Sequence, residues 1–220
     1  MSWRADSEKL ETVVLIHGLW FSGWSMSLLR HRLLRAGYRV KVFSYPTVSA
    51  DLDDNACALA RFATAQQADR LHFVAHSLGG LVLLTMLGSG LQLPPGRAVL
   101  LGSPIGGSRA VDSMARWRWT RSILGRSILQ WHRYPMTGVP RLEIGVIAGG
   151  KGLGLGCVIA RLPLPHDGTV AVDETRAPLL ADHLVLPVTH SGLLISRTVA
   201  VQTCHFLRDG HFYRHECTDA

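Results

Sequence analysis

The sequence contains no uninterrupted run of about eighteen apolar residues, the length that a membrane-spanning helix requires. It also shows no apolar signal region at its start, because residues 1–11 are mostly polar and a β-rich apolar segment follows at once. These absences argue against a membrane span and predict an intracellular, cytoplasmic protein.

Cysteines are few and scattered. They form no CxxC pair and no dense spacing, so free thiols in a reducing compartment are expected. Cysteines and histidines after residue 203 match no zinc pattern, because Cys204 and His205 point about 100° apart on a helix. The glycine-rich segment 149–156 contains Lys151 but no following Ser or Thr, so it is no phosphate loop. We therefore expect no metal and no other cofactor.

The composition is that of a globular protein. With 220 residues, 47% of them hydrophobic and 18% charged, the chain can bury a substantial core in one domain, residues 1–220. The formal net charge of +7, carried mainly by arginine, points to acidic partners or membrane surfaces. No nucleic-acid partner is predicted.

Strand-like and helical segments alternate along the chain. This alternation predicts an α/β protein with a mostly parallel sheet of about six strands and helices on both faces. A closing helix is expected over residues 191–207. The predicted strands are residues 12–16, 39–44, 71–75, 97–101, 142–148 and 183–186.

Residues 103–141 fit this alternation poorly, because the stretch is too long for one crossover. Its part 109–133 holds six arginines, interleaved with Trp117, Trp119 and Trp131. Long insertions in compact domains are usually lids or binding elements, so we interpret residues 103–141 as an inserted cap. Its basic, tryptophan-rich part is a candidate surface for an acidic carrier protein or a membrane.

A predicted strand ends and an apolar helix begins within residues 75–80, Ala-His-Ser-Leu-Gly-Gly. A serine with small residues two positions before and after it, in a strand–turn–helix, is typical of a nucleophile elbow. The turn is sharp, so its small residues let strand and helix pass closely while the hydroxyl stays exposed. We predict Ser77 as a nucleophile.

A serine hydroxyl is a weak nucleophile and needs a base that a third group orients. His190 follows the last predicted strand, and Asp167 lies in the loop region after the strand ending near Ala148. Ser77, His190 and Asp167 form the predicted triad.

Other residues could take these roles. His72 and His183 are candidates for the base, although both lie within predicted strands that would orient them. Asp173 or Glu174 could replace Asp167 as the orienting acid.

Four motifs follow one another along the chain. They are Val-Val-Leu-Ile-His-Gly at 13–18, Ala-His-Ser-Leu-Gly-Gly at 75–80, Asp-Gly-Thr-Val at 167–170 and Thr-His-Ser-Gly-Leu-Leu at 189–194. Together they resemble the α/β-hydrolase superfamily, especially small bacterial lipases and esterases whose nucleophile motif begins with alanine. The resemblance covers about residues 12–208 and implies the α/β-hydrolase fold and triad order.

The resemblance also implies two backbone N–H groups that stabilise an oxyanion, those of Leu19 and Leu78. Trp20 and Trp24 either line an acyl pocket or pack against the first helix. Together these features predict a serine hydrolase that cleaves small-molecule carboxylic esters through an acyl-enzyme. The alternatives are an acyl-carrier-protein or acyl-CoA thioesterase or a methyl esterase, and a non-catalytic binding module on the same scaffold.

Overall fold

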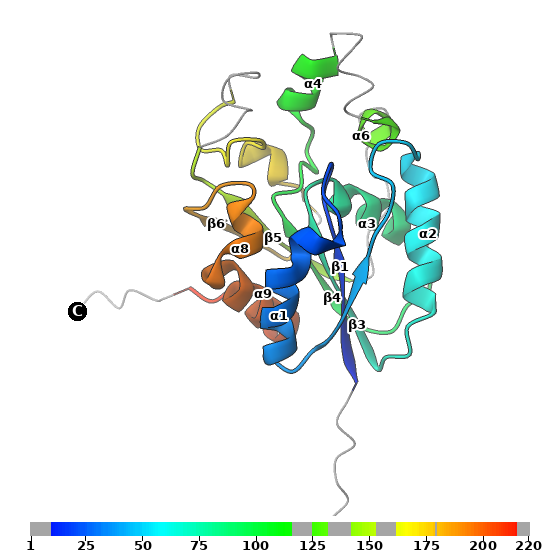
Figure 1. Cartoon of the computed structure of the whole chain (residues 1–220). Coiled ribbons are helices and arrows are strands. Elements are labelled where there is room, and N and C mark those ends of the chain that lie inside the picture. Colours follow the sequence, from blue (N-terminus) through cyan, green and yellow to red (C-terminus); the bar gives the residue numbers. More distant parts are fainter. Residues whose placement is uncertain (1–9, 116–124, 132–141, 153–161, 179, 215–220) are drawn as a thin grey trace, which may run out of the picture.

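The computed structural model describes residues 10–115, 125–131, 142–152, 162–178 and 180–214. Within them, six parallel strands form one sheet in the order β2-β1-β3-β4-β5-β6 (Figure 1). The predicted α/β architecture is confirmed, and each strand begins and ends within one residue of its expected bounds. The strands are β1 (Glu11–Ile16), β2 (Arg39–Phe43), β3 (Arg70–His76), β4 (Arg97–Leu101), β5 (Glu143–Gly149) and β6 (Asp182–Leu186).

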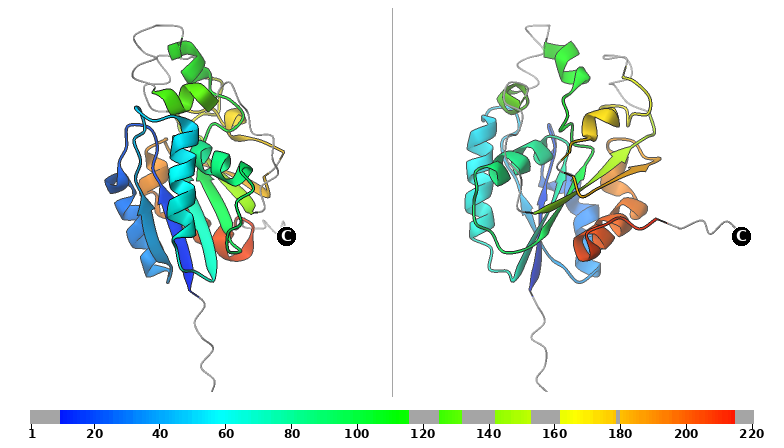
Figure 2. Two further views of the ribbon diagram at one scale, coloured as in Figure 1. Left: turned by 90° about the vertical axis from the view of Figure 1, so that its right-hand side faces the viewer. Right: turned by 180° about the vertical axis from the view of Figure 1, so that it is seen from behind.

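Helices cover both faces of the sheet (Figures 1 and 2). In chain order they are η1 (Gly23–Met26), α1 (Ser27–Arg35), α2 (Leu52–Thr64), α3 (Leu78–Gly88), α4 (Arg109–Ala115), α6 (Arg126–Trp131), η2 (Asp173–Thr175), α8 (Gly192–Ile195) and α9 (Arg197–Asp209). Consecutive strand residues point to opposite faces, so β1 supplies both layers of the core. Val14 and Ile16 pack with α2 and α3, whereas Val13 and Leu15 pack with α1, α8 and α9.

The expected closing helix is two helices. Ser196 separates α8 from α9 with an extended backbone (φ −69°, ψ 131°), and its Oγ accepts from the Val199 N–H at 3.3 Å. A serine oxygen that satisfies a free N–H of the first turn starts a new helix, which explains the break. Gly210, with φ 82°, ends α9.

The stretch predicted as a cap contains α4 and α6, which lie beyond the carboxyl ends of the strands (Figure 1). α6 is attached to the start of α2: Ser127 Oγ accepts from Asn55 Nδ2 at 2.9 Å, and Gln130 Oε1 accepts from the Leu52 N–H at 2.8 Å. Trp117 and Trp119 lie outside the described residues, so a cap function stays a prediction. Among the helices described, none is long and apolar enough to cross a membrane.

Candidate active site

Ser77 lies in the turn between β3 and α3, at the carboxyl edge of the sheet. Its backbone takes φ 53° and ψ −122°, and its N–H donates to the Leu101 carbonyl oxygen at 2.9 Å. A positive φ at a residue with a side chain is costly, and it persists only where the surrounding structure enforces it. The chain therefore makes a sharp, strained turn at this serine.

The first strand and the loop after it run close to this turn. A Cβ on Gly79 would lie 2.6 Å from the His17 carbonyl oxygen, and a Cβ on Gly18 would lie 3.0 Å from the Cβ of Ser77. Any larger residue would force β1 and α3 apart, so this packing requires glycine at both positions. The close approach brings the β1 loop beside Ser77.

His190 and Asp167 form a pair joined by two hydrogen bonds. The His190 ring Nδ1 lies 2.6 Å from Asp167 Oδ2, and the His190 backbone N–H donates to the Asp167 carbonyl oxygen at 2.9 Å. An ionised carboxylate only accepts, so Nδ1 carries the shared proton and Nε2 is left to face other groups. This arrangement fixes both the tautomer and the orientation of the ring.

The Asp167 carboxylate is itself held firmly. It is 1% exposed, and its second oxygen, Oδ1, accepts from the N–H groups of Thr169 at 2.9 Å and Val170 at 2.7 Å. Gly168, with φ 96°, allows the tight turn that aims these donors at the carboxylate. Hydrogen bonds to both oxygens therefore stabilise the Asp167 carboxylate in its buried position.

His76 is a site residue that sequence reasoning named only as part of a motif. Its ring centroid lies 4.7 Å from that of His190, and its Nε2–H donates to the His190 carbonyl oxygen at 3.2 Å. Burial, followed by the nearby His190, holds the pKa of His76 well below its ordinary value, so the ring is neutral. His76 directly precedes Ser77, so its hydrogen bond connects the Ser77 turn to the backbone of His190.

Gly102, at the end of β4, was also missed as a site residue. A Cβ there would lie 3.1 Å from both His190 Nδ1 and Asp167 Oδ2. With φ 59° this position favours glycine on conformational grounds as well. Periodicity gives no signal for such a residue, because its role is to leave room for side chains from distant parts of the chain.

The two predicted oxyanion donors are the backbone N–H groups of Leu78 and Leu19. Leu78 is the first residue of α3, and Leu19 follows the loop glycine that approaches Ser77. In the described parts of the chain, neither backbone N–H is engaged in a hydrogen bond. Both groups remain available to an acceptor, although their role in catalysis stays a prediction.

The two tryptophans predicted near the site are exposed. Trp20 is 58% exposed and Trp24 is 85% exposed, so neither is buried against α1. Between them along the chain, Phe21 meets the His76 ring edge-on with centroids 5.7 Å apart. Whether Trp20 and Trp24 contact an acyl chain stays a prediction.

The alternative bases have other partners. His72 Nδ1 accepts from the Arg97 N–H at 3.1 Å, and the His183 ring lies 2.8 Å from the Thr175 hydroxyl oxygen. Burial, followed by neighbouring arginines, lowers the pKa of each histidine to about 4. Neither ring contacts the Asp167–His190 pair among the described residues.

The alternative acids also have other partners. Asp173 forms a bidentate pair with Arg109 at 3.0–3.1 Å, and Glu174 accepts from the backbone N–H groups of Arg109 and Ala171. Within the described residues, no group of three or more His, Cys, Asp or Glu could hold a metal ion.

The fold is that of a known family. The model of the alpha/beta hydrolase family matches residues 13–203, and the chain therefore belongs to this family. No curated protein sequence matches it significantly.

Solved structures agree with this fold at low sequence identity. The Bacillus licheniformis lipase BlEst2 in its propeptide form has a TM-score of 0.74 and 17% identity over 93% of this chain, which spans about half (52%) of that lipase chain. The metagenomic carboxyl esterase MGS0156 has a TM-score of 0.67 and 18% identity over 84% of this chain and 65% of its own. The RedJ thioesterase of the Streptomyces coelicolor prodiginine pathway has a TM-score of 0.59 and 14% identity over 91% and 85%.

Proposed function

We propose that this protein hydrolyses carboxylic esters through an acyl-enzyme, with Ser77 as nucleophile, His190 as general base and Asp167 as orienting acid. One observation carries the proposal. The 2.6 Å contact between His190 Nδ1 and the buried Asp167 carboxylate forms at the same edge of the sheet as the strained Ser77 turn. A nucleophile, a base and a group that orients the base are the minimum that acyl transfer requires.

The chemistry proceeds in two halves. Nε2 of His190 takes the Ser77 hydroxyl proton as Oγ bonds to the ester carbonyl carbon, and the backbone N–H groups of Leu19 and Leu78 donate to the resulting oxyanion. The ester C–O bond then breaks, and the imidazolium returns its proton to the leaving alcohol. Water, deprotonated by His190, next attacks the acyl carbon. The bond between that carbon and Ser77 Oγ breaks, the carboxylic acid leaves, and the imidazolium returns its proton to Oγ, which restores Ser77 and His190. Asp167 stays ionised throughout and stabilises the imidazolium.

The test is hydrolysis of a chain-length series of p-nitrophenyl esters by the wild type, Ser77→Ala and His190→Ala. We expect both variants to lose about 10⁴-fold or more in kcat, because nucleophile and base act as one unit. Ser89→Ala, at the opposite end of α3, is the matched control and should keep full activity. Unchanged turnover in both site variants would reject the proposal, and the preferred chain length separates an esterase from a lipase.

A second candidate is hydrolysis of acyl thioesters or methyl esters on a carrier protein or CoA. It is supported by the likeness to the RedJ thioesterase and by the basic stretch 109–133. Turnover of carrier-linked substrates should then fall steeply with added salt and in Arg118→Glu/Arg121→Glu, two positions outside the described residues. A flat salt profile would count against carrier docking, whereas binding to sedimented liposomes would assign the same stretch to a membrane surface.

A binding module without activity remains the third possibility for this scaffold. A serine-directed phosphonate distinguishes it. Covalent labelling of the wild type but not of Ser77→Ala supports a working nucleophile, whereas absence of labelling in both proteins favours the binding module.

A further inference from the structure

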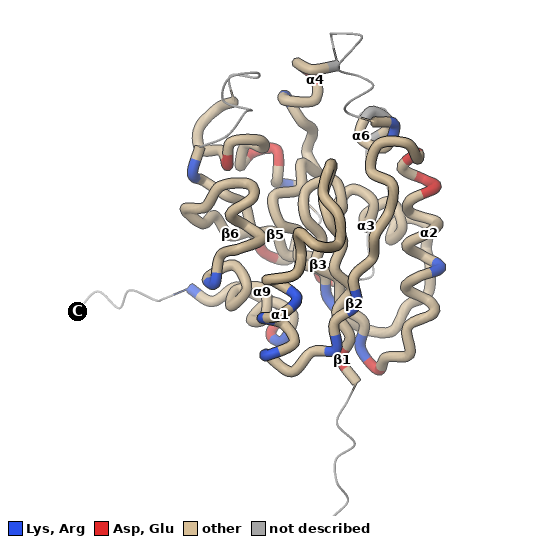
Figure 3. The backbone as a smooth tube through the Cα atoms, in the orientation of Figure 1, with Lys and Arg blue, Asp and Glu red and all other residues tan. Residues whose placement is uncertain are grey.

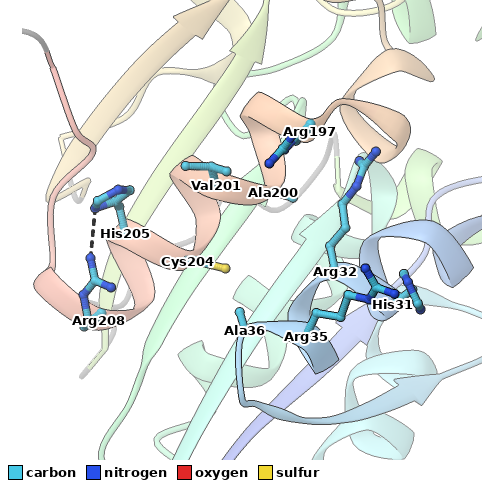
Figure 4. A pocket seen from close by; sticks show the side chains of 10 residues that line it. All are labelled: His31, Arg32, Arg35, Ala36, Arg197, Ala200, Val201, Cys204, His205 and Arg208. Atoms are coloured by element: carbon cyan, nitrogen blue, oxygen red, sulfur yellow. Dashed lines mark hydrogen bonds between the residues drawn. The ribbon is translucent and has the colours of Figure 1, made fainter.

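A cleft of about 630 Å³ lies between α1 and α9, on the face of the sheet opposite α2 and α3 (Figure 4). Its volume is in the range of small-molecule binding sites. Its lining comes from one face of each helix and consists of His31, Arg32, Arg35, Ala36, Arg197, Ala200, Val201, Cys204, His205 and Arg208.

The sequence explains why the two helices leave this space. Along α9 the lining residues recur every three or four positions, so they form one stripe, and Ala200 belongs to it. Ala36 ends the facing stripe of α1. The small side chains of Ala36 and Ala200 leave space between the two helices, and arginine side chains line it. Figure 4 shows Cys204 pointing between the helices.

The charge of the cleft is net positive. Four of its side chains are arginines, and α1 and α8 contain no acidic residue (Figure 3). The carboxylate of Asp209 is engaged by Arg208, with Nε–Oδ1 at 3.1 Å and Nη2–Oδ2 at 3.0 Å, and lies 3.5 Å from His205 Nδ1, so it offsets charge at that end of the cleft. In the described ranges, no carboxylate lies within ion-pair distance of Arg35 or Arg197. Two exposed arginines therefore line one cleft, and no carboxylate of the described residues pairs with either of them.

We propose that this cleft binds an anion that carries a phosphate group. Guanidinium groups reach it from both helices, and a phosphate can accept from donors in several directions, whereas a carboxylate offers two coplanar oxygens that one guanidinium satisfies. Arg32 adds a fixed donor, because its Nη1 is held by the Ile195 carbonyl oxygen at 2.7 Å while the rest of its fork stays available. The phosphate could belong to a free small molecule or to a lipid headgroup. The site is distinct from the Ser77 edge and does not depend on the ester chemistry.

The test is titration of the full chain with inorganic pyrophosphate by calorimetry, at low ionic strength and at 0.15 M salt. The cleft variant is Arg35→Gln/Arg197→Gln, which leaves Arg32 and its bond to Ile195 in place. The control is Arg30→Gln/Arg61→Gln, which removes the same charge from two exposed helical arginines outside the cleft. Sedimentation with phosphatidylcholine vesicles, with and without phosphatidic acid, is run in parallel.

We expect saturable pyrophosphate binding that the cleft variant weakens at least tenfold and the control leaves within twofold. The same contrast on phosphatidic acid vesicles alone also supports the site and assigns the phosphate to a lipid headgroup. Equal losses in both double variants would mean general electrostatic attraction and would overturn the proposal. Absence of binding by the wild type to both probes would overturn it as well. Melting temperatures of all variants within about 3 °C of the wild type show that the fold is intact.

Discussion

Two short turns on the connection between β5 and β6 carry similar acids but use them differently. In the first turn, residues 165–170, Asp167 points its carboxylate at the His190 ring and at two backbone N–H groups of its own turn. In the second, η2, the Glu174 carboxylate accepts from the backbone N–H groups of Arg109 and Ala171 and lies 3.8 Å from Arg109 Nη1, and Asp173 pairs with Arg109 near the surface. The first turn therefore contacts the His190 ring, and the second contacts the first residue of α4, Arg109.

The groups around each carboxylate, and not the type of acid, distinguish the two turns. Glu174 is as buried as a site residue, and burial raises the pKa of its carboxyl group, which by itself is a common mark of an active site. The hydrogen bonds of Glu174 nevertheless go to the backbone of the segment that leads into α4. Its carbonyl oxygen accepts from the Gly106 N–H at 2.8 Å, and its carboxylate accepts from the Arg109 N–H. Glu174 therefore anchors α4 to this edge, whereas the Asp167 carboxylate contacts the His190 ring.

Among substitutions in the two turns, Asp167→Asn should have the largest effect on activity. An asparagine would present either an N–H or a neutral oxygen to His190 Nδ1, which removes the charge that fixes the tautomer and stabilises the imidazolium. We expect kcat for p-nitrophenyl esters to fall about 10⁴-fold.

The controls are Asp173→Asn and Glu174→Gln, which should keep kcat within a few-fold of the wild type. Full activity in Asp167→Asn together with a large loss in either control would assign the orienting role to the second turn.

Glu174→Gln should have an intermediate effect, on stability and not on catalysis. A glutamine keeps one acceptor but places an N–H donor against a backbone N–H, so we expect a loss of about 1–2 kcal/mol in the free energy of unfolding. Urea denaturation at pH 7.5 and at pH 5 measures it.

The pH dependence has a defined sign. Burial raises the pKa of Glu174 above its usual 4.5, so the native state binds this proton more tightly than the unfolded chain does. Its contribution to stability is complete below that usual value and is lost as the pH rises through the folded pKa. The deficit of Glu174→Gln should accordingly be larger at pH 5 than at pH 7.5, and a deficit that grows with pH would contradict this account.

Asp173→Asn should have the smallest effect. Its pair with Arg109 is more than half exposed on both sides, and exposed pairs contribute little because water and salt screen them. We expect the melting temperature to fall by less than about 2 °C at low salt and to match the wild type at 1 M salt. A larger shift that persists at high salt would show that Asp173, too, anchors α4.

Several parts of the fold and site were predictable from local sequence. The strand at residues 71–75 and the serine turn after it are encoded by a β-rich run followed by small residues, and both are found. The break at Ser196 was not predicted, because the apolar periodicity continues across it and only the cap geometry interrupts the helix. The choice among Asp167, Asp173 and Glu174 stayed open for a similar reason, since all three follow the same strand.

The sequence by itself determined the α/β alternation, the six strands and the position of Ser77, because each depends on neighbouring residues and on side-chain periodicity. Packing between distant parts of the chain sets which acid contacts His190, why Gly102 must lack a side chain, and that α1 and α9 form an arginine-lined cleft. These features depend on distances between residues far apart in the chain, and such distances are set by how the helices and strands pack.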